Sequence, residues 1–112
     1  MKINQVALQL FTLREYLVSP EAVATTLGKV AAIGYPAVQV SGMPAGVLSE
    51  AELRALCRKN NLTLCATHEP ARVILDDVRK VISRLKALHC TYTAYPHPAG
   101  IDMTSPESVA GL

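Results

Sequence analysis

Residues 37–67 read AVQVSGMPAGVLSEAELRALCRKNNLTLCAT, and this stretch decides the fold. Short aliphatic runs at residues 37–40 and 63–67 predict two strands of the kind that parallel sheets bury beneath helices. Between them, Ser49 and Glu52 have the spacing of a capping box, in which two side chains satisfy free backbone N–H groups at a helix start. A strand, a helix and a second strand in this order predict parallel strands joined by a helical crossover.

The same unit occurs on the N-terminal side of this stretch. Residues 5–10 (QVALQL) have the composition of a strand, and residues 19–21 (Ser-Pro-Glu) have that of a helix start. Gly34 is suited to end this first helix, because glycine readily adopts the left-handed backbone conformation found at helix ends. Asn61 is suited to end the second helix in the same way.

A third unit follows, and a fourth begins. The third helix is predicted to carry an apolar stripe that comprises Ile74, Val78, Val81, Ile82, Leu85 and Leu88. Asp76 and Asp77 lie early in this helix and Lys86 lies late, as the helix dipole favours. A fourth strand is predicted at residues 92–95, and residues 105–107 repeat the Ser-Pro-Glu helix start. We therefore expect about four strands and three complete helices, in a domain truncated after its fourth strand.

The spacing of the strands favours a barrel. Their predicted starts, near residues 5, 37, 63 and 91, give a period that matches one unit of an eightfold β/α barrel of ~250 residues. We predict an α/β fold of parallel β/α units, with residues 1–112 forming the N-terminal half of a (β/α)₈ barrel. The alternative is a small open sheet, which needs strands out of sequential order and helices on both faces.

The composition indicates a folded protein with a buried core. Half of the residues are hydrophobic and 18% are charged, which excludes disorder. The net charge of +2 comes from dispersed basic residues, so neither a nucleic acid nor an anionic membrane is indicated as a partner. The apolar runs are shorter than the ~20 residues of a membrane span. The N-terminal residues lack the features of a signal peptide, so we expect a cytoplasmic protein.

The cysteines predict structural thiols rather than a metal site. Cys57, Cys65 and Cys90 form neither an even set nor a close pair, which favours reduced, buried side chains. Cys65 and His68 have a Cys-x-x-His spacing, but no second matched pair accompanies them. Zinc held by Cys57, Cys65 and His68 is therefore disfavoured, and no metal ligand is assigned to this chain.

Candidate binding residues follow the predicted strands. In parallel β/α folds, ligands bind where the carboxyl ends of the strands and the following loops converge. Gln9 follows the first strand, Ser41 the second, His68 the third and His97 the fourth, and Arg14 lies in the first loop. We predict these five residues as substrate-binding groups.

The histidines and Arg14 each allow a second interpretation. His68 is suited to hydrogen-bond a substrate hydroxyl or carbonyl group or to shuttle a proton, whereas the alternative is a solvent-facing loop histidine bonded to backbone. The same alternative applies to His97, which lies in a more flexible loop between two prolines. Arg14 and Glu15 could orient an anionic or polyhydroxy ligand or form an ordinary ion pair. His89 is predicted at the opposite rim, where residues serve stability.

Four segments together resemble a known superfamily. Residues 6–14 (VALQLFTLR), 33–35 (IGY), 38–42 (VQVSG) and 65–68 (CATH) have the order and spacing of xylose-isomerase-like barrels. More narrowly, the chain is similar to the sugar phosphate isomerase/epimerase branch. The resemblance implies a (β/α)₈ barrel that isomerises or epimerises a sugar or sugar phosphate. It also implies that the full-length parent binds a divalent metal ion (Mg²⁺, Mn²⁺, Co²⁺ or Zn²⁺), which stabilises an enediolate while carboxylates transfer protons.

The resemblance transfers few residues to this chain. His68 matches a histidine that lines the sugar pocket, and Gln9 and Ser41 match pocket-facing strand ends. Gln39 stands where many relatives have a glutamate, so the charge at that position is absent here. The metal ligands of the family lie on strands five to eight. We therefore expect this chain alone to bind no metal ion and to lack isomerase activity.

Two other functions remain as alternatives. The chain could be a non-catalytic half-barrel module that forms a homo-oligomer or pairs with a complementary half-barrel, because the unpaired edges of a parallel sheet readily associate. It could instead be a fragment of an endonuclease IV-like barrel, which belongs to the same superfamily. The weak basicity and the scarcity of aromatic residues count against that second alternative.

Overall fold

A computed structural model describes residues 1–112 and contains one parallel sheet with the strand order β1-β2-β3-β4. Its strands are β1 (Ala7–Gln9), β2 (Ala37–Val40), β3 (Thr63–His68) and β4 (Thr93–Ala94). Its helices are α1 (Pro20–Ile33), α2 (Glu50–Lys59), α3 (Ala71–Asp76), α4 (Val78–Leu88) and α5 (Pro106–Ala110), with 3₁₀ helices η1 (Ile3–Gln5) and η2 (Leu10–Tyr16). No helix combines the length and the apolar composition that crossing a bilayer requires. The predicted α/β fold of parallel β/α units is confirmed.

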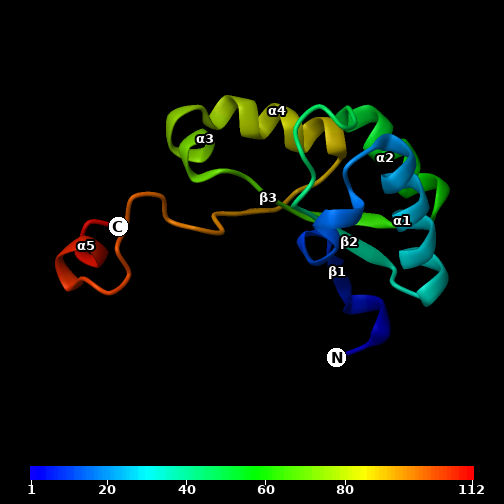
Figure 1. Cartoon of the computed structure of the whole chain (residues 1–112), viewed down its shortest axis with the longest axis horizontal. Coiled ribbons are helices and arrows are strands. Elements are labelled where there is room, and N and C mark those ends of the chain that lie inside the picture. Colours follow the sequence, from blue (N-terminus) through cyan, green and yellow to red (C-terminus); the bar gives the residue numbers. More distant parts are fainter.

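The helices cover one face of the sheet. The register pairs Leu8 with Val38 and Val38 with Leu64, so these side chains share a face, and all three are buried or half-buried. Helix α1 contacts α2, and α2 contacts α4, so these three helices lie side by side over that face (Figure 1). The open-sheet alternative required helices on both faces and strands out of order, and the structure has neither. We call the uncovered side the open face; its residues include Ala7, Gln9, Gln39 and Ala66.

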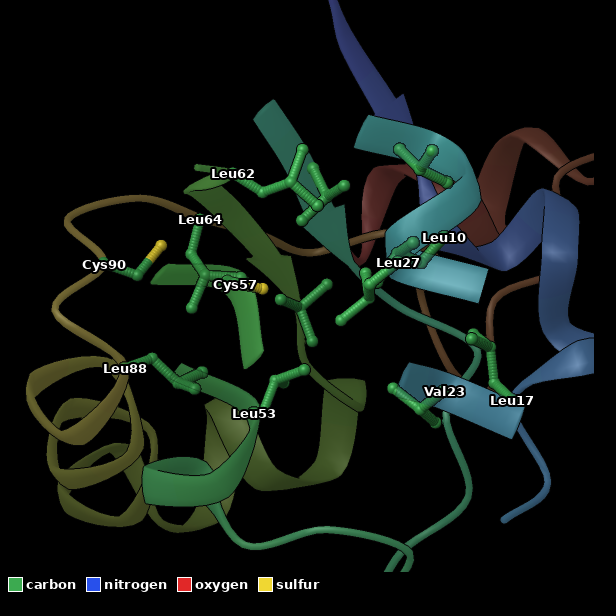
Figure 2. Close-up of a cluster of buried hydrophobic side chains, with 13 residues drawn as sticks. Leu10, Leu17, Val23, Leu27, Leu53, Cys57, Leu62, Leu64, Leu88 and Cys90 are labelled. Carbon is green, nitrogen blue, oxygen red and sulfur yellow. The ribbon is translucent and has the colours of Figure 1, made fainter. Parts of the chain in front are cut away.

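The core lies between the sheet and this helix layer. It is a cluster of 13 buried side chains, all of them leucine, valine or cysteine. Figure 2 shows two groups within this cluster: Leu10, Leu17, Val23 and Leu27 on one side, and Leu53, Cys57, Leu62, Leu64, Leu88 and Cys90 on the other. The first group joins η2 and the residue after it to α1, and the second joins β3 to α2 and α4. The core therefore fixes the positions of the loops that follow the strands.

Local capping explains where the first two helices begin and end. Ser19 Oγ accepts a hydrogen bond from the Ala22 backbone N–H at 3.1 Å. Ser49 forms the predicted capping box, in which its Oγ accepts from the Glu52 N–H at 3.2 Å and its own N–H donates to the Glu52 carboxylate at 2.8 Å. Gly34 and Asn61 are both left-handed, with φ of 114° and 55°. These four predictions are confirmed.

The third helix was predicted to be continuous, and this prediction is wrong. Asp77 has φ −146° and ψ 67°, so the backbone breaks there into α3 and α4. The Asp77 carboxylate accepts a hydrogen bond from the Lys80 N–H at 3.2 Å and caps the second of these helices. Within α4, Val81 and Leu88 are buried and Leu85 is half-buried, whereas Val78 and Ile82 are exposed, contrary to the predicted apolar stripe.

Two predicted strands are longer than those observed. Strand β1 begins at Ala7 rather than at Gln5, and β4 contains only Thr93 and Ala94. Beyond β4 the chain leaves the body of the molecule, and α5 lies apart from the helix layer (Figure 1). The radius of gyration is consequently 15.4 Å, against about 13 Å for a compact domain of roughly 100 residues.

Candidate functional site

A cleft of about 820 Å³ lies at the carboxyl edge of the sheet. Four of the five predicted binding residues line it: Gln9, Ser41, His68 and His97. Its walls include the loop at residues 42–46, the start of α2, and parts of α3 and α4. The structure therefore brings together side chains from the ends of β1, β2 and β3 and from the loop after β4, as the convergence of parallel strand ends predicts.

Ser41 links the segment after β1 to the end of β2 by hydrogen bonds. It is buried, and its Oγ accepts a hydrogen bond from the Phe11 backbone N–H at 3.0 Å. The same hydroxyl donates to Gln39 Oε1 at 2.7 Å. The observed hydrogen bonds of Ser41 are thus internal, although the residue borders the cleft. The Gln39 Nε2 atom is buried and has no hydrogen-bond partner.

Gly42 lets two loops of the cleft approach each other closely. Its φ is +73°, and a Cβ atom at this position would lie 2.8 Å from the Phe11 Cα atom and 3.1 Å from the Arg14 Cβ atom. A side chain would therefore force the loop after β1 away from the loop after β2. Glycine is required here by both conformation and space.

Arg14 stands apart from the other predicted binding residues. Its guanidinium lies 4.4 Å from the centroid of the Phe11 ring, and its Nη1 atom donates to the Phe11 carbonyl oxygen at 3.1 Å. Arg14 is exposed and does not line the cleft. A cation–π contact of this exposed kind contributes about 0.5–1 kcal/mol and organises the first loop.

The histidines occupy three different environments. His68 is half-buried at the end of β3, paired in register with Ala94, and faces the cleft. His97 is exposed in the loop after β4 and borders the same cleft. His89 has φ 51° and ends α4 near Thr63, at the opposite edge of the sheet, where it was predicted to lie.

An ion-pair network in the cleft was not predicted from the sequence. Glu69 directly follows His68, and only 5% of its surface is exposed. Arg84 on α4 donates to Glu69 Oε1 in a close ion pair, and its Nε atom lies 3.4 Å from Glu50 Oε1 on α2. The sequence did contain a signal for this pair. Arg84 falls between Val81 and Leu88 at helical spacing, which places it on the buried side of α4.

No metal site fits the residues of this chain. The structure contains no group of three or more histidine, cysteine, aspartate or glutamate side chains placed to hold a metal ion. All three cysteines are free; Cys57 and Cys90 are buried, whereas Cys65 is only half-buried, contrary to the prediction. The Cys65 thiol donates to the Val38 carbonyl oxygen at 3.3 Å. Burial raises the pKa of Cys57 to about 11, so this thiol is protonated at neutral pH.

The fold and the cleft define a parallel β/α protein whose potential binding groups lie at the carboxyl edge of its sheet. Neither the known protein-family models nor the curated proteins include a match to this chain. Any assignment of function therefore depends on the cleft itself and on the sequence resemblance.

Proposed function

We propose that this chain forms the N-terminal half of a (β/α)₈ barrel of the xylose-isomerase-like type, and that its cleft binds a sugar. The observation that carries the proposal is the convergence of Gln9, His68 and His97 on one cleft at the carboxyl edge of a sequentially ordered parallel sheet. Barrel enzymes bind their substrates at this edge. Helices on a single face of the sheet also support this reading, because a barrel keeps all its helices outside.

On this proposal the chain contributes substrate binding rather than the reaction centre. The full-length parent is a sugar isomerase or epimerase, which moves a proton next to the carbonyl group of a ketose. The resemblance assigns the metal ligands and the proton-transferring carboxylates to later strands of the barrel, and the residues of this chain form no group placed to hold a metal ion. The side chains of His68 and Gln9 offer hydrogen-bond donors and acceptors for sugar hydroxyl groups.

An assembly role is a second candidate, and the open face favours it. Ala7 and Gln9 on this face are exposed, and nothing in the structure pairs with the outer edges of β1 and β4. The unpartnered Gln39 Nε2 atom also belongs to a side chain of this face. In a complete barrel this surface faces inward, so either a second copy of the chain or a complementary half-barrel would cover it.

Binding of a ketose by the 112-residue chain tests the proposal. We expect D-fructose to shift the backbone and side-chain NMR signals of Gln9, His68 and His97 in a saturable manner. His68→Asn is expected to weaken this binding at least about fivefold, because a hydrogen bond to the ligand is lost.

His89→Asn is the matched control, because asparagine also tolerates the left-handed conformation of residue 89. It is expected to leave binding unchanged. Signal changes confined to other surfaces, or equal losses in both variants, would contradict the proposed sugar site. Turnover of ketohexoses by the chain with Mg²⁺ or Mn²⁺ would contradict the assignment of the reaction centre to other strands.

A further inference from the structure

The Glu69–Arg84 ion pair gives the cleft a charged group that neither the sequence pattern nor the proposed function assigns. Glu69 is 5% exposed, so its carboxylate is largely shielded from water. Burying a carboxylate costs free energy unless a cation and hydrogen bonds compensate for the loss of water. The Arg84 guanidinium supplies both through Nη1, which donates to Glu69 Oε1.

One oxygen of Glu69 remains free for a ligand. Oε1 is engaged by Arg84, whereas Oε2 accepts no hydrogen bond from the protein. Oε2 is not among the fully buried atoms that lack a partner, so part of its surface is accessible, and Glu69 lines the cleft. An ionised oxygen in a shielded site is a strong acceptor for the O–H groups of a ligand. The imidazole of His68, the preceding residue, borders the same space.

The charges of the cleft are balanced, which argues against an anionic ligand at this point. Arg84 and Lys80 contribute two positive charges to its lining, and Glu50 and Glu69 contribute two negative ones. Both carboxylates contact Arg84. A phosphate group would therefore have to compete with Glu69 and Glu50 for the guanidinium, and would meet the repulsion of both. Lys80 makes no ion pair, but it is exposed and its charge is screened by solvent.

We infer that Glu69, held by Arg84, is a ligand-binding residue that accepts hydrogen bonds from the hydroxyl groups of an uncharged polyol and disfavours the phosphorylated form of the same sugar. This inference rests on the proposed sugar site and narrows its substrate class. Arg84 acts through Glu69 and is a positioning residue.

The experiment compares two probes, D-fructose and D-fructose 6-phosphate, by NMR titration of the whole chain and its variants. The unmodified chain is expected to bind D-fructose at least about fivefold more tightly than the phosphate ester, since the ester brings a charge that the two carboxylates repel. Glu69→Gln keeps the shape of the side chain and removes its charge. It is expected to weaken D-fructose binding by roughly fivefold and to strengthen binding of the ester, because Arg84 then becomes available to the phosphate.

Three further variants separate this effect from a general change of charge or fold. Glu107→Gln in α5 removes the same charge from an exposed position outside the cleft, and it is expected to change neither affinity. Arg84→Gln leaves Glu69 unpaired and is expected to destabilise the chain, so its titration is interpreted only if circular dichroism shows native helix content. Arg84→Lys restores a cation and is expected to recover part of the D-fructose binding.

The outcomes distinguish the inference from the function on which it rests. If neither probe binds in the cleft, the proposed sugar site is wrong and the inference is overturned with it. If the unmodified chain prefers the phosphate ester, or if Glu69→Gln leaves the ratio of the two affinities unchanged, the sugar site stands and only the inference about Glu69 is overturned.

Discussion

Gly42 shows how a single residue controls the cleft. Its substitution by alanine would place a Cβ atom 2.8 Å from the Phe11 Cα atom, at a backbone φ of +73°. We expect Gly42→Ala to lower the free energy of unfolding by about 2–3 kcal/mol, since overpacking adds to the cost of the left-handed conformation. Gly46→Ala is the matched control: φ is +81° there, but nothing lies within 4 Å. Urea denaturation that gives equal losses for both variants would show that the contact with Phe11 has no energetic effect.

The buried Cys57 thiol makes the stability of the chain depend on pH in the alkaline range. Its pKa is raised from 9.0 to about 11 by burial, so the folded chain holds this proton over a range in which the unfolded chain loses it. The contribution of this retained proton to the free energy of unfolding is fully present below pH 9 and is lost as pH rises towards 11. We expect the free energy of unfolding of the unmodified chain to fall more steeply over this interval than that of Cys57→Val. Parallel slopes in denaturation at several pH values would contradict the assignment.

Single residues of the site could be predicted only where chain direction alone determines their position. Four of the predicted residues lie at or after strand ends: Gln9, Ser41, His68 and His97. The ends of parallel strands meet at one edge of the sheet, so the position of these residues does not depend on other contacts. The Glu69–Arg84 pair is different, because it joins residues 15 positions apart across a helix break that the sequence pattern did not indicate. The hydrogen bond from the Phe11 N–H to Ser41 was equally inaccessible, because its two residues lie 30 positions apart.

The helices are determined by local signals, and the strands are not. Ser19 and Ser49 satisfy backbone N–H groups only three residues away, so the two helix starts are readable in the sequence. Strands β1 and β4 end where their neighbours no longer pair with them, and no short segment encodes that limit. Asp77 is a capping residue within a pattern of continuous helical spacing, which explains why the break between α3 and α4 was not predicted.

The helix caps can be compared directly. Ser49→Ala and Asp77→Ala each remove a side chain that accepts a hydrogen bond from a backbone N–H group at 3.2 Å. We expect each substitution to lower the free energy of unfolding by about 1 kcal/mol. Ala55→Gly, at an exposed interior position of α2, calibrates the cost of weakening that helix without touching a cap, also about 1 kcal/mol. Thermal unfolding provides the measurement, and an unchanged melting temperature in Asp77→Ala would show that α4 does not depend on its cap.

At the scale of the whole molecule, the arrangement of layers leaves apolar and backbone groups without partners. Helices α1, α2 and α4 cover one face of the sheet, whereas the open face and both outer strand edges are uncovered. Large apolar side chains such as Ile3, Leu75 and Tyr92 are also mostly exposed. Unpaired strand edges are ready templates for pairing with another chain. We therefore expect the chain to associate with another chain through the open face.

Ala7 provides a test of this association, because it lies on the open face at the exposed edge strand β1. We expect the purified chain to form dimers or larger assemblies in light scattering coupled to gel filtration, with a mass that rises with concentration. Ala7→Arg is expected to shift the chain towards the monomer, since a buried and unpaired guanidinium is costly in the associated state. The same change at Ala55, on the exposed side of α2, is expected to leave the mass unchanged. A monomer at all concentrations, or equal dissociation in both variants, would mean that the open face does not mediate contact between copies.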